Sequence, residues 1–130
     1  LLHDGTQNLI DAMNRTGVRR LVCVTLLGVG ESHRNASLTY RKLILPMLSP
    51  MLPDKQRQED VIRASDLEWV IVRPPRFVGG KPTGTAQIIP DGQPGRVGKV
   101  IREDLANILL DLATNDQFAR HTVIVGSRPT

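Results

Sequence analysis

Three runs of consecutive apolar residues, separated by amphipathic stretches, dominate the hydropathy pattern of this 130-residue chain. They predict strands at residues 21–25, 69–73 and 122–125. Apolar residues at successive rather than alternate positions are typical of parallel-sheet strands that are buried on both faces. We therefore expect all three strands in one sheet, with the first two as parallel neighbours.

Helical periodicity fills much of the sequence between these runs. It predicts helices at residues 6–16, 54–65 and 103–114, and the second should begin with Asp54 as its N-cap and pack across the first two strands. A further short helix should start near residue 38 and end near residue 45, where three prolines begin to interrupt the pattern.

The remaining segments are rich in glycine, proline and polar residues. Residues 26–37 are expected to be a loop. Residues 87–89 and 97–101 flank the turn sequence PDGQPG and resemble a small hairpin that projects from the sheet. Strands alternating with helices indicate an α/β fold with right-handed crossovers, and about three strands are too few for a complete doubly wound sheet.

Composition excludes several function classes. The net charge is +4, but the basic residues are dispersed and aromatic residues are only 3% of the chain, which argues against a nucleic-acid partner. No apolar run approaches the roughly 20 residues of a membrane-spanning helix. The single cysteine, Cys23, permits no disulfide within the chain and favours the reducing cytoplasm.

Simple motifs for phosphate, metal or nucleophilic chemistry are not matched. The run Gly28-Val29-Gly30 starts like a dinucleotide fingerprint but has His33 at the third glycine position. The three histidines are far apart along the chain and have no accompanying cysteine or carboxylate cluster, so no metal site is predicted. Gly-x-Ser-x-Gly is absent.

The candidate site residues instead lie where the predicted strands end. Thr25 ends the first strand, Pro74, Pro75 and Arg76 follow the second, and Lys55 is at the start of the intervening helix. Ligands of open α/β sheets bind at the carboxyl ends of the strands. These residues are therefore the expected ligand-binding set.

Residues 54–75, DKQRQEDVIRASDLEWVIVRPP, resemble the signature of the atypical short-chain dehydrogenases/reductases, and within them the NmrA-like and biliverdin-IXβ/flavin reductase group. Residues 5–9, 22–25 and 102–106 resemble further parts of the same fold in the same order. The resemblance implies a partial Rossmann-type three-layer α/β/α domain with a mostly parallel sheet. Because the chain starts without Met and enters a helix at once, residues 1–130 are expected to be the C-terminal portion of one NAD(P)-binding domain, with its N-terminal half missing.

The resemblance also implies residue roles. Lys55, in a Lys-x-x-x-Glu pattern with Glu59, would reach the nicotinamide ribose, and Thr25 would lie near the nicotinamide. The Pro74-Pro75 turn would approach the carboxamide, and Arg76 would lie on the substrate side. The alternatives are a solvated lysine at a helix start and a threonine that only terminates a strand. The cofactor is expected to be NADP or NAD, with NADP favoured.

The departures from the family pattern concern the general acid. The tyrosine of the Tyr-x-x-x-Lys pair would fall at Met51, the strand-end serine at Leu26, and Tyr40 has Ile44 four residues later. No catalytic residue is identified. This pattern favours NAD(P)H-dependent hydride transfer to a small aromatic, flavin, quinone or tetrapyrrole-like acceptor, with a non-catalytic NAD(P)-sensing regulator resembling NmrA as the alternative.

Overall fold

The computed structural model describes residues 2–128 of the chain. The helices are α1 (Leu2–Thr16), α2 (Leu45–Leu48), α3 (Leu52–Arg63) and α4 (Arg102–Thr114). Single-turn helical segments occupy Ser32–Asn35, Tyr40–Ile44 and Ser49–Met51. The strands are β1 (Arg20–Val24), β2 (Glu68–Arg73), β3 (Arg76–Val78), β4 (Gln87–Pro90), β5 (Lys99–Ile101) and β6 (His121–Gly126).

The main sheet has four strands in the order β1-β2-β6-β4. β1 and β2 are parallel neighbours, with Leu21 opposite Trp69, and β6 continues the parallel arrangement with Thr122 opposite Ile71. These pairings confirm the prediction that the three apolar runs share one mostly parallel sheet. A second, two-stranded sheet pairs β3 with β5.

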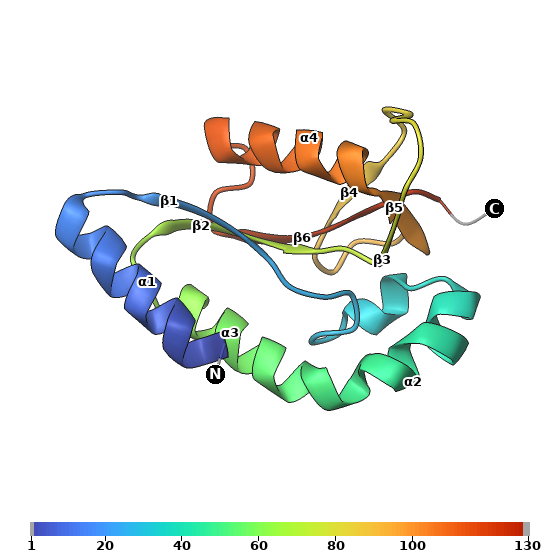
Figure 1. The fold of residues 1–130 in the computed structure, drawn as a ribbon, viewed down its shortest axis with the longest axis horizontal. Helices are drawn as coiled ribbons and strands as arrows, with labels where there is room; N and C mark the ends of the chain where they lie inside the picture. Colours follow the sequence, from blue (N-terminus) through green and yellow to red (C-terminus); the bar gives the residue numbers. More distant parts are fainter. Residues whose placement is uncertain (1, 129–130) are drawn as a thin grey trace.

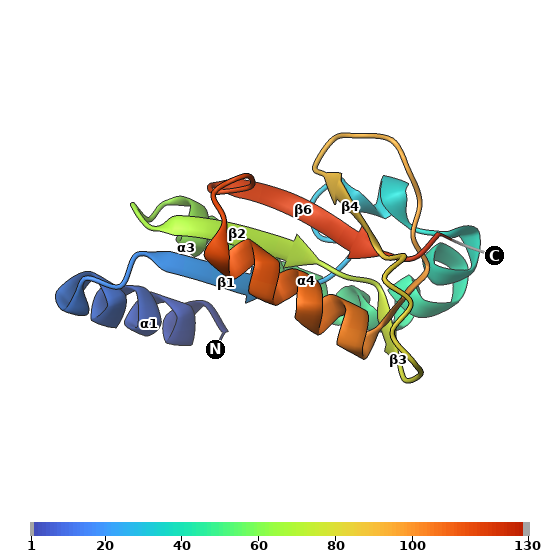
Figure 2. The same ribbon diagram turned by 90° about the horizontal axis from the view of Figure 1, so that it is seen from above.

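Helices cover both faces of the main sheet, which confirms the three-layer α/β/α architecture. α1 and α3 pack against each other on one face, and α4 covers the opposite face (Figures 1 and 2). Since successive strand residues point to opposite faces, β2 contributes to a core on each side. Val70 and Val72 pack with the α4 side, and Trp69 and Ile71 with the α1/α3 side.

The predicted hairpin at residues 87–101 is wrong. β4 pairs antiparallel with β6, with Ile88 opposite Val125, whereas β5 pairs in parallel with β3. The apolar residues identify each segment as a strand but do not identify the strand with which it pairs. β4 takes the free edge of β6, where Ile89 is buried at 5% exposure beside Ile124, and the turn sequence spans the space between two sheets.

The start of the central helix also differs from the prediction. α3 begins at Leu52, and Met51 occupies the N-cap position without a side-chain cap, so Asp54 lies inside the first turn. Asp54 instead accepts a contact from His3 Nδ1 at 3.5 Å. The three prolines that suggested an irregular connection lie in the first turns of α2, of the segment Ser49–Met51 and of α3, where a missing N–H costs nothing.

Candidate functional site

The carboxyl ends of β1 and β2 meet side by side. The Thr25 amide donates to the carbonyl of Val72 at 2.8 Å, and the Leu27 amide donates to the carbonyl of Pro74 at 3.0 Å. Two of the predicted site segments, Thr25 and Pro74-Pro75, are therefore brought together at one edge of the sheet. Both prolines are buried, and Thr25 is only 5% exposed.

A buried ionic network lies directly beneath this edge. The Glu59 carboxylate on α3 is fully buried and accepts hydrogen bonds from Arg73 Nε at 3.0 Å and Arg73 Nη2 at 2.6 Å. Arg63 Nη2 adds a third bond at 2.8 Å. The remaining bond, at 2.6 Å, comes from the hydroxyl of Thr25. The network thus ties the helix to the ends of both strands.

The charge state of Glu59 determines what Thr25 can do. Burial acts to raise the pKa of the Glu59 carboxyl, but the hydrogen bonds and charge of Arg73, the bond from Thr25 and the charge of Arg63 outweigh it, and the pKa lies below its usual value. An ionised carboxylate only accepts hydrogen bonds, so the Thr25 hydroxyl must donate to it. Thr25 therefore retains acceptor capacity alone for any ligand.

Lys55 lies one helical turn before Glu59 on α3, and its side chain is partly buried. Within residues 2–128 its ammonium has no hydrogen bond or ion pair. Lys55 lies near Cys23 of β1. Burial raises the pKa of the Cys23 thiol, the nearby positive charge of Lys55 opposes this rise, and the negative charge of Glu59 adds to it. The structure thus brings Lys55 close to Cys23 of β1, and Cys23 is two residues before Thr25 in the sequence.

Arg76 is placed apart from this group. It starts β3, is exposed, and lies opposite Lys99 of β5 in the small sheet. The connection to the strand ends passes through Pro75, whose Cγ would lie 3.1 Å from a Cβ built on Gly126 at the end of β6.

The glycine loop after β1 packs against the buried ionic network and does not form a pyrophosphate site. The Gly28 amide donates to Ser32 Oγ at 2.8 Å, so this N–H is already used within the loop. Gly30 has φ +62°, and a Cβ there would lie 3.1 Å from Arg73 Nη2. The loop therefore closes over the Arg73 guanidinium, which agrees with the failed fingerprint at His33.

Tyr40 is a structural residue. Its side chain is 1% exposed, its hydroxyl donates to the carbonyl of Leu27 at 3.0 Å, and burial raises its pKa to about 12. A phenol that is buried, bonded and this weakly acidic does not face a ligand at the strand ends.

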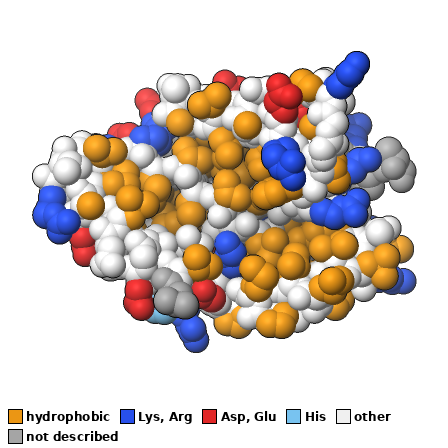
Figure 3. All heavy atoms as spheres, viewed as in Figure 1, with side chains coloured by type: hydrophobic (Ala, Val, Ile, Leu, Met, Phe, Trp, Pro, Cys, Tyr) orange, Lys and Arg blue, Asp and Glu red, His pale blue; other side chains and the backbone are white. Residues whose placement is uncertain are grey.

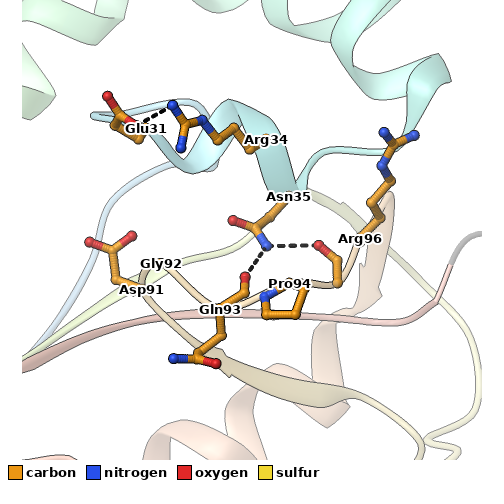
Figure 4. A pocket seen from close by; sticks show the side chains of 9 residues that line it. Glu31, Arg34, Asn35, Asp91, Gly92, Gln93, Pro94 and Arg96 are labelled. Carbon is orange, nitrogen blue, oxygen red and sulfur yellow. Dashed lines mark hydrogen bonds and ion pairs between the residues drawn. The ribbon is translucent and has the colours of Figure 1, made fainter.

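A cavity of about 560 Å³ lies on the far side of the network (Figure 4). Asp91 forms part of its wall and accepts a hydrogen bond from Arg73 Nη1 at 3.3 Å. Asn35 closes its floor by donating to the carbonyls of Gln93 and Gly95 at 2.9 and 2.7 Å. Arg34 is paired with Glu31 at 2.8 Å. Most polar groups here are thus engaged with one another.

Apolar side chains gather on the face that carries β1. In Figure 3 they form one group over β1 and another over the helical segment around α2, with basic side chains between them. Leu43, Met47 and Met51, from the helical segment before α3, are among the exposed large hydrophobic residues. No helix within residues 2–128 has the length and apolar character needed to cross a membrane.

Sequence reasoning identified Glu59 only as part of a family pattern and Arg73 only as a strand end. A signal for their pairing existed. Glu59 is three residues before the core residue Ile62 on the same helix face, and Arg73 continues an otherwise apolar buried strand. Two opposite charges at core positions are expected to form an ion pair, because burying an unpaired charge costs free energy.

Comparison with known proteins identifies the family of the chain. Residues 2–116 match the family model for NAD(P)H-binding domains. An uncharacterised chloroplastic protein of Arabidopsis thaliana is 26% identical over 124 residues, which are 95% of this chain and 44% of the plant protein.

Solved structures share the fold. A short-chain dehydrogenase/reductase from Veillonella parvula in complex with NADP is 20% identical with a TM-score of 0.81, over 100% of this chain and 64% of that protein. An anaerobilin reductase from Escherichia coli is 24% identical with a TM-score of 0.81, over 99% of this chain and 61% of that protein. The chain thus spans less than two thirds of each of these relatives.

Proposed function

Because the chain belongs to the NAD(P)H-binding family, we propose that the ends of β1 and β2 hold the nicotinamide end of NADP(H) and that the protein reduces a small conjugated acceptor. The acceptor class is a flavin, quinone, small aromatic or tetrapyrrole-like molecule. The observation that carries this proposal is the ammonium of Lys55, unpaired within residues 2–128, on the helix whose next turn holds Thr25 through Glu59.

The residues at this edge fit a nicotinamide riboside. Lys55 offers three donors on a flexible stem, which suits ribose hydroxyls. Thr25 offers an acceptor for an N–H or O–H group, and the Pro74-Pro75 turn offers a rigid wall. The pyrophosphate has no comparable site in this part of the chain, since the glycine loop is closed on Ser32 and Arg73.

Bound NAD(P)H would supply a hydride. The chain's own contribution is then to position the nicotinamide and the acceptor and to exclude water, because correct placement of the reacting groups lowers the barrier. Among the described residues no hydroxyl acid faces this edge, because Thr25 donates to Glu59 and Tyr40 is buried and bonded; the ammonium of Lys55 is the proton donor that these contacts leave there. That favours acceptors whose reduced form is stabilised by conjugation.

The test is oxidation of NADPH by the full-length protein, followed by absorbance, with a flavin, a quinone and a linear tetrapyrrole as separate acceptors. We expect turnover with at least one acceptor and faster turnover with NADPH than with NADH. Binding of NADPH without oxidation by any acceptor would refute the reductase assignment.

That outcome would support the second candidate, an NAD(P)-sensing regulator resembling NmrA. The lack of a hydroxyl acid in the described part of the site is the observation that favours it. We also propose that residues 1–130 form a portion of one NAD(P)-binding domain, which acts on a small molecule rather than on a nucleic acid. The lone thiol of Cys23 supports a reducing compartment such as the cytoplasm.

A further inference from the structure

A second cavity, of about 610 Å³, opens where the small sheet meets the end of β6. Its apolar part is formed by Val78 and Ile101, and its polar part by Thr83, Thr85, Lys99 and Arg128. The volume lies within the roughly 300–1,000 Å³ range of small-molecule sites. This cavity could not be foreseen from the sequence, because its walls come from four separate segments.

The lining of this cavity is cationic. Lys99 and Arg128 have no ion pair within residues 2–128, and no Asp or Glu lines the cavity. Arg76 is the register partner of Lys99, and neighbours on parallel strands point to the same side of a sheet. Arg76 therefore extends the positive surface from the cavity toward the end of β2.

An acidic side chain that contacts the lining residue Thr83 is already bound. Asp104 accepts bonds from the Thr83 amide at 3.0 Å, the Gly84 amide at 3.1 Å and the Thr83 hydroxyl at 2.9 Å. Since Thr83 donates to Asp104, the 2.6 Å contact between the two threonine hydroxyls requires Thr85 to donate to Thr83. The charged donors left for a ligand are thus Lys99 and Arg128.

The cavity is joined to the candidate nicotinamide edge. Ser127, in the lining, donates its amide to the carbonyl of Lys99 at 2.8 Å, and the preceding Gly126 packs against Pro75. A Cβ on Gly126 would lie 3.2 Å from that carbonyl and 3.1 Å from Pro75 Cγ. The wall of the cavity is therefore continuous with the turn that follows β2.

We propose that this cavity binds an anionic oxygen group, a carboxylate or a phosphate, carried by the acceptor. The proposal rests on the reductase function proposed above. The apolar walls would contact the acceptor's carbon skeleton, while Lys99 and Arg128 form charge-assisted hydrogen bonds with its anion.

The experiment compares charged and neutral acceptors with the full-length protein. One pair is a linear tetrapyrrole with free propionates and its dimethyl ester, and the other is flavin mononucleotide and riboflavin. The variants are Lys99→Gln and Arg128→Gln, with Lys81→Gln as the control, an exposed lysine of the neighbouring loop that does not line the cavity. KM is measured for each acceptor and for NADPH.

We expect Lys99→Gln and Arg128→Gln to raise KM for the charged member of one pair about tenfold, the usual scale for one hydrogen bond to a charged group. KM for its neutral partner and for NADPH should stay constant. The pair that responds identifies carboxylate or phosphate. Equal effects on charged and neutral members, or none, would overturn the proposal.

Failure of the reductase function is a separate result. If no acceptor is reduced, calorimetric binding of the same pairs in the presence of NADP⁺ gives the second readout. Weaker binding of only the charged member in Lys99→Gln still supports the cavity assignment. Unchanged binding of both members, or binding of neither to the wild type, refutes it.

Discussion

Replacing Arg73 by leucine isolates the energetic role of the buried network. The change Arg73→Leu leaves the Glu59 carboxylate fully buried with only Thr25 and Arg63 as partners. Removing one partner of a buried ion pair costs about 3–5 kcal/mol, because the remaining charge is uncompensated. Arg63 still supplies one bond, so we expect a loss near the lower end, about 3 kcal/mol of unfolding free energy at pH 7.

Urea unfolding of the full-length protein, followed by far-UV circular dichroism, measures this loss. Trp69, the single tryptophan of residues 1–130, lies on β2, four residues before Arg73, and its fluorescence adds a local probe. The matched control is Arg63→Leu. Its side chain is 32% exposed, so this change should cost about 1 kcal/mol or less.

The pH dependence distinguishes an unpaired charge from simple loss of packing. In the wild type the pKa of Glu59 is lowered, so its contribution is present above the unfolded-state pKa of about 4.3 and is lost as the pH falls through the folded-state pKa. In Arg73→Leu burial should dominate and raise that pKa. The penalty is then largest at pH 7 and shrinks as the pH is lowered and Glu59 gains a proton.

The free-energy gap between wild type and Arg73→Leu should therefore narrow between pH 7 and about pH 4.5, a range in which the wild-type carboxylate is still ionised. A gap below about 1 kcal/mol at pH 7 would contradict the buried-pair mechanism, since it would match the value of an exposed pair. A gap that does not change with pH would assign the loss to packing.

Three further outcomes are expected. Lys55→Ala in the full-length protein should raise the dissociation constant of NADPH about tenfold with little change in stability, and Lys42→Ala should do neither; equal affinities would make Lys55 a surface charge only. Gly30→Ala should lower the unfolding free energy by about 1–2 kcal/mol, because φ is +62° and the new Cβ would press on Arg73 Nη2; a thermal midpoint equal to the wild type would contradict this. The 130-residue chain alone should bind NADPH poorly, because no phosphate-binding glycine motif is matched in it; micromolar affinity by calorimetry would show that the site is misplaced.

The central strands could be predicted because their residues leave no alternative. Runs such as Val70-Ile71-Val72 are apolar on both faces, and only a sheet covered by helices buries both. The pairing of β1 with β2 in parallel confirms the expected neighbours. The partners of β4 and β5 could not be predicted, since short apolar segments fit any free edge of suitable register.

The start of α3 was missed for a different reason. Pro53 was interpreted as a break, yet proline in a first helical turn loses no hydrogen bond. The side-chain network was missed because periodicity assigns positions to faces but does not pair them. Only the fold brings Glu59 within 2.6 Å of an arginine 14 residues later.

Hydrogen-bond direction at Thr25 links the network to the proposed chemistry. With Glu59 ionised, the Thr25 hydroxyl gives its proton to the carboxylate and can only accept from a ligand. It therefore orients a donor but cannot protonate a developing alkoxide. An isolated carbonyl group needs such protonation, whereas a flavin, quinone or conjugated tetrapyrrole delocalises the charge until solvent supplies the proton. The ionised state of Glu59, which makes the Glu59–Arg73 pair costly to break, also commits the Thr25 proton. This favours acceptors that need correct placement rather than acid catalysis.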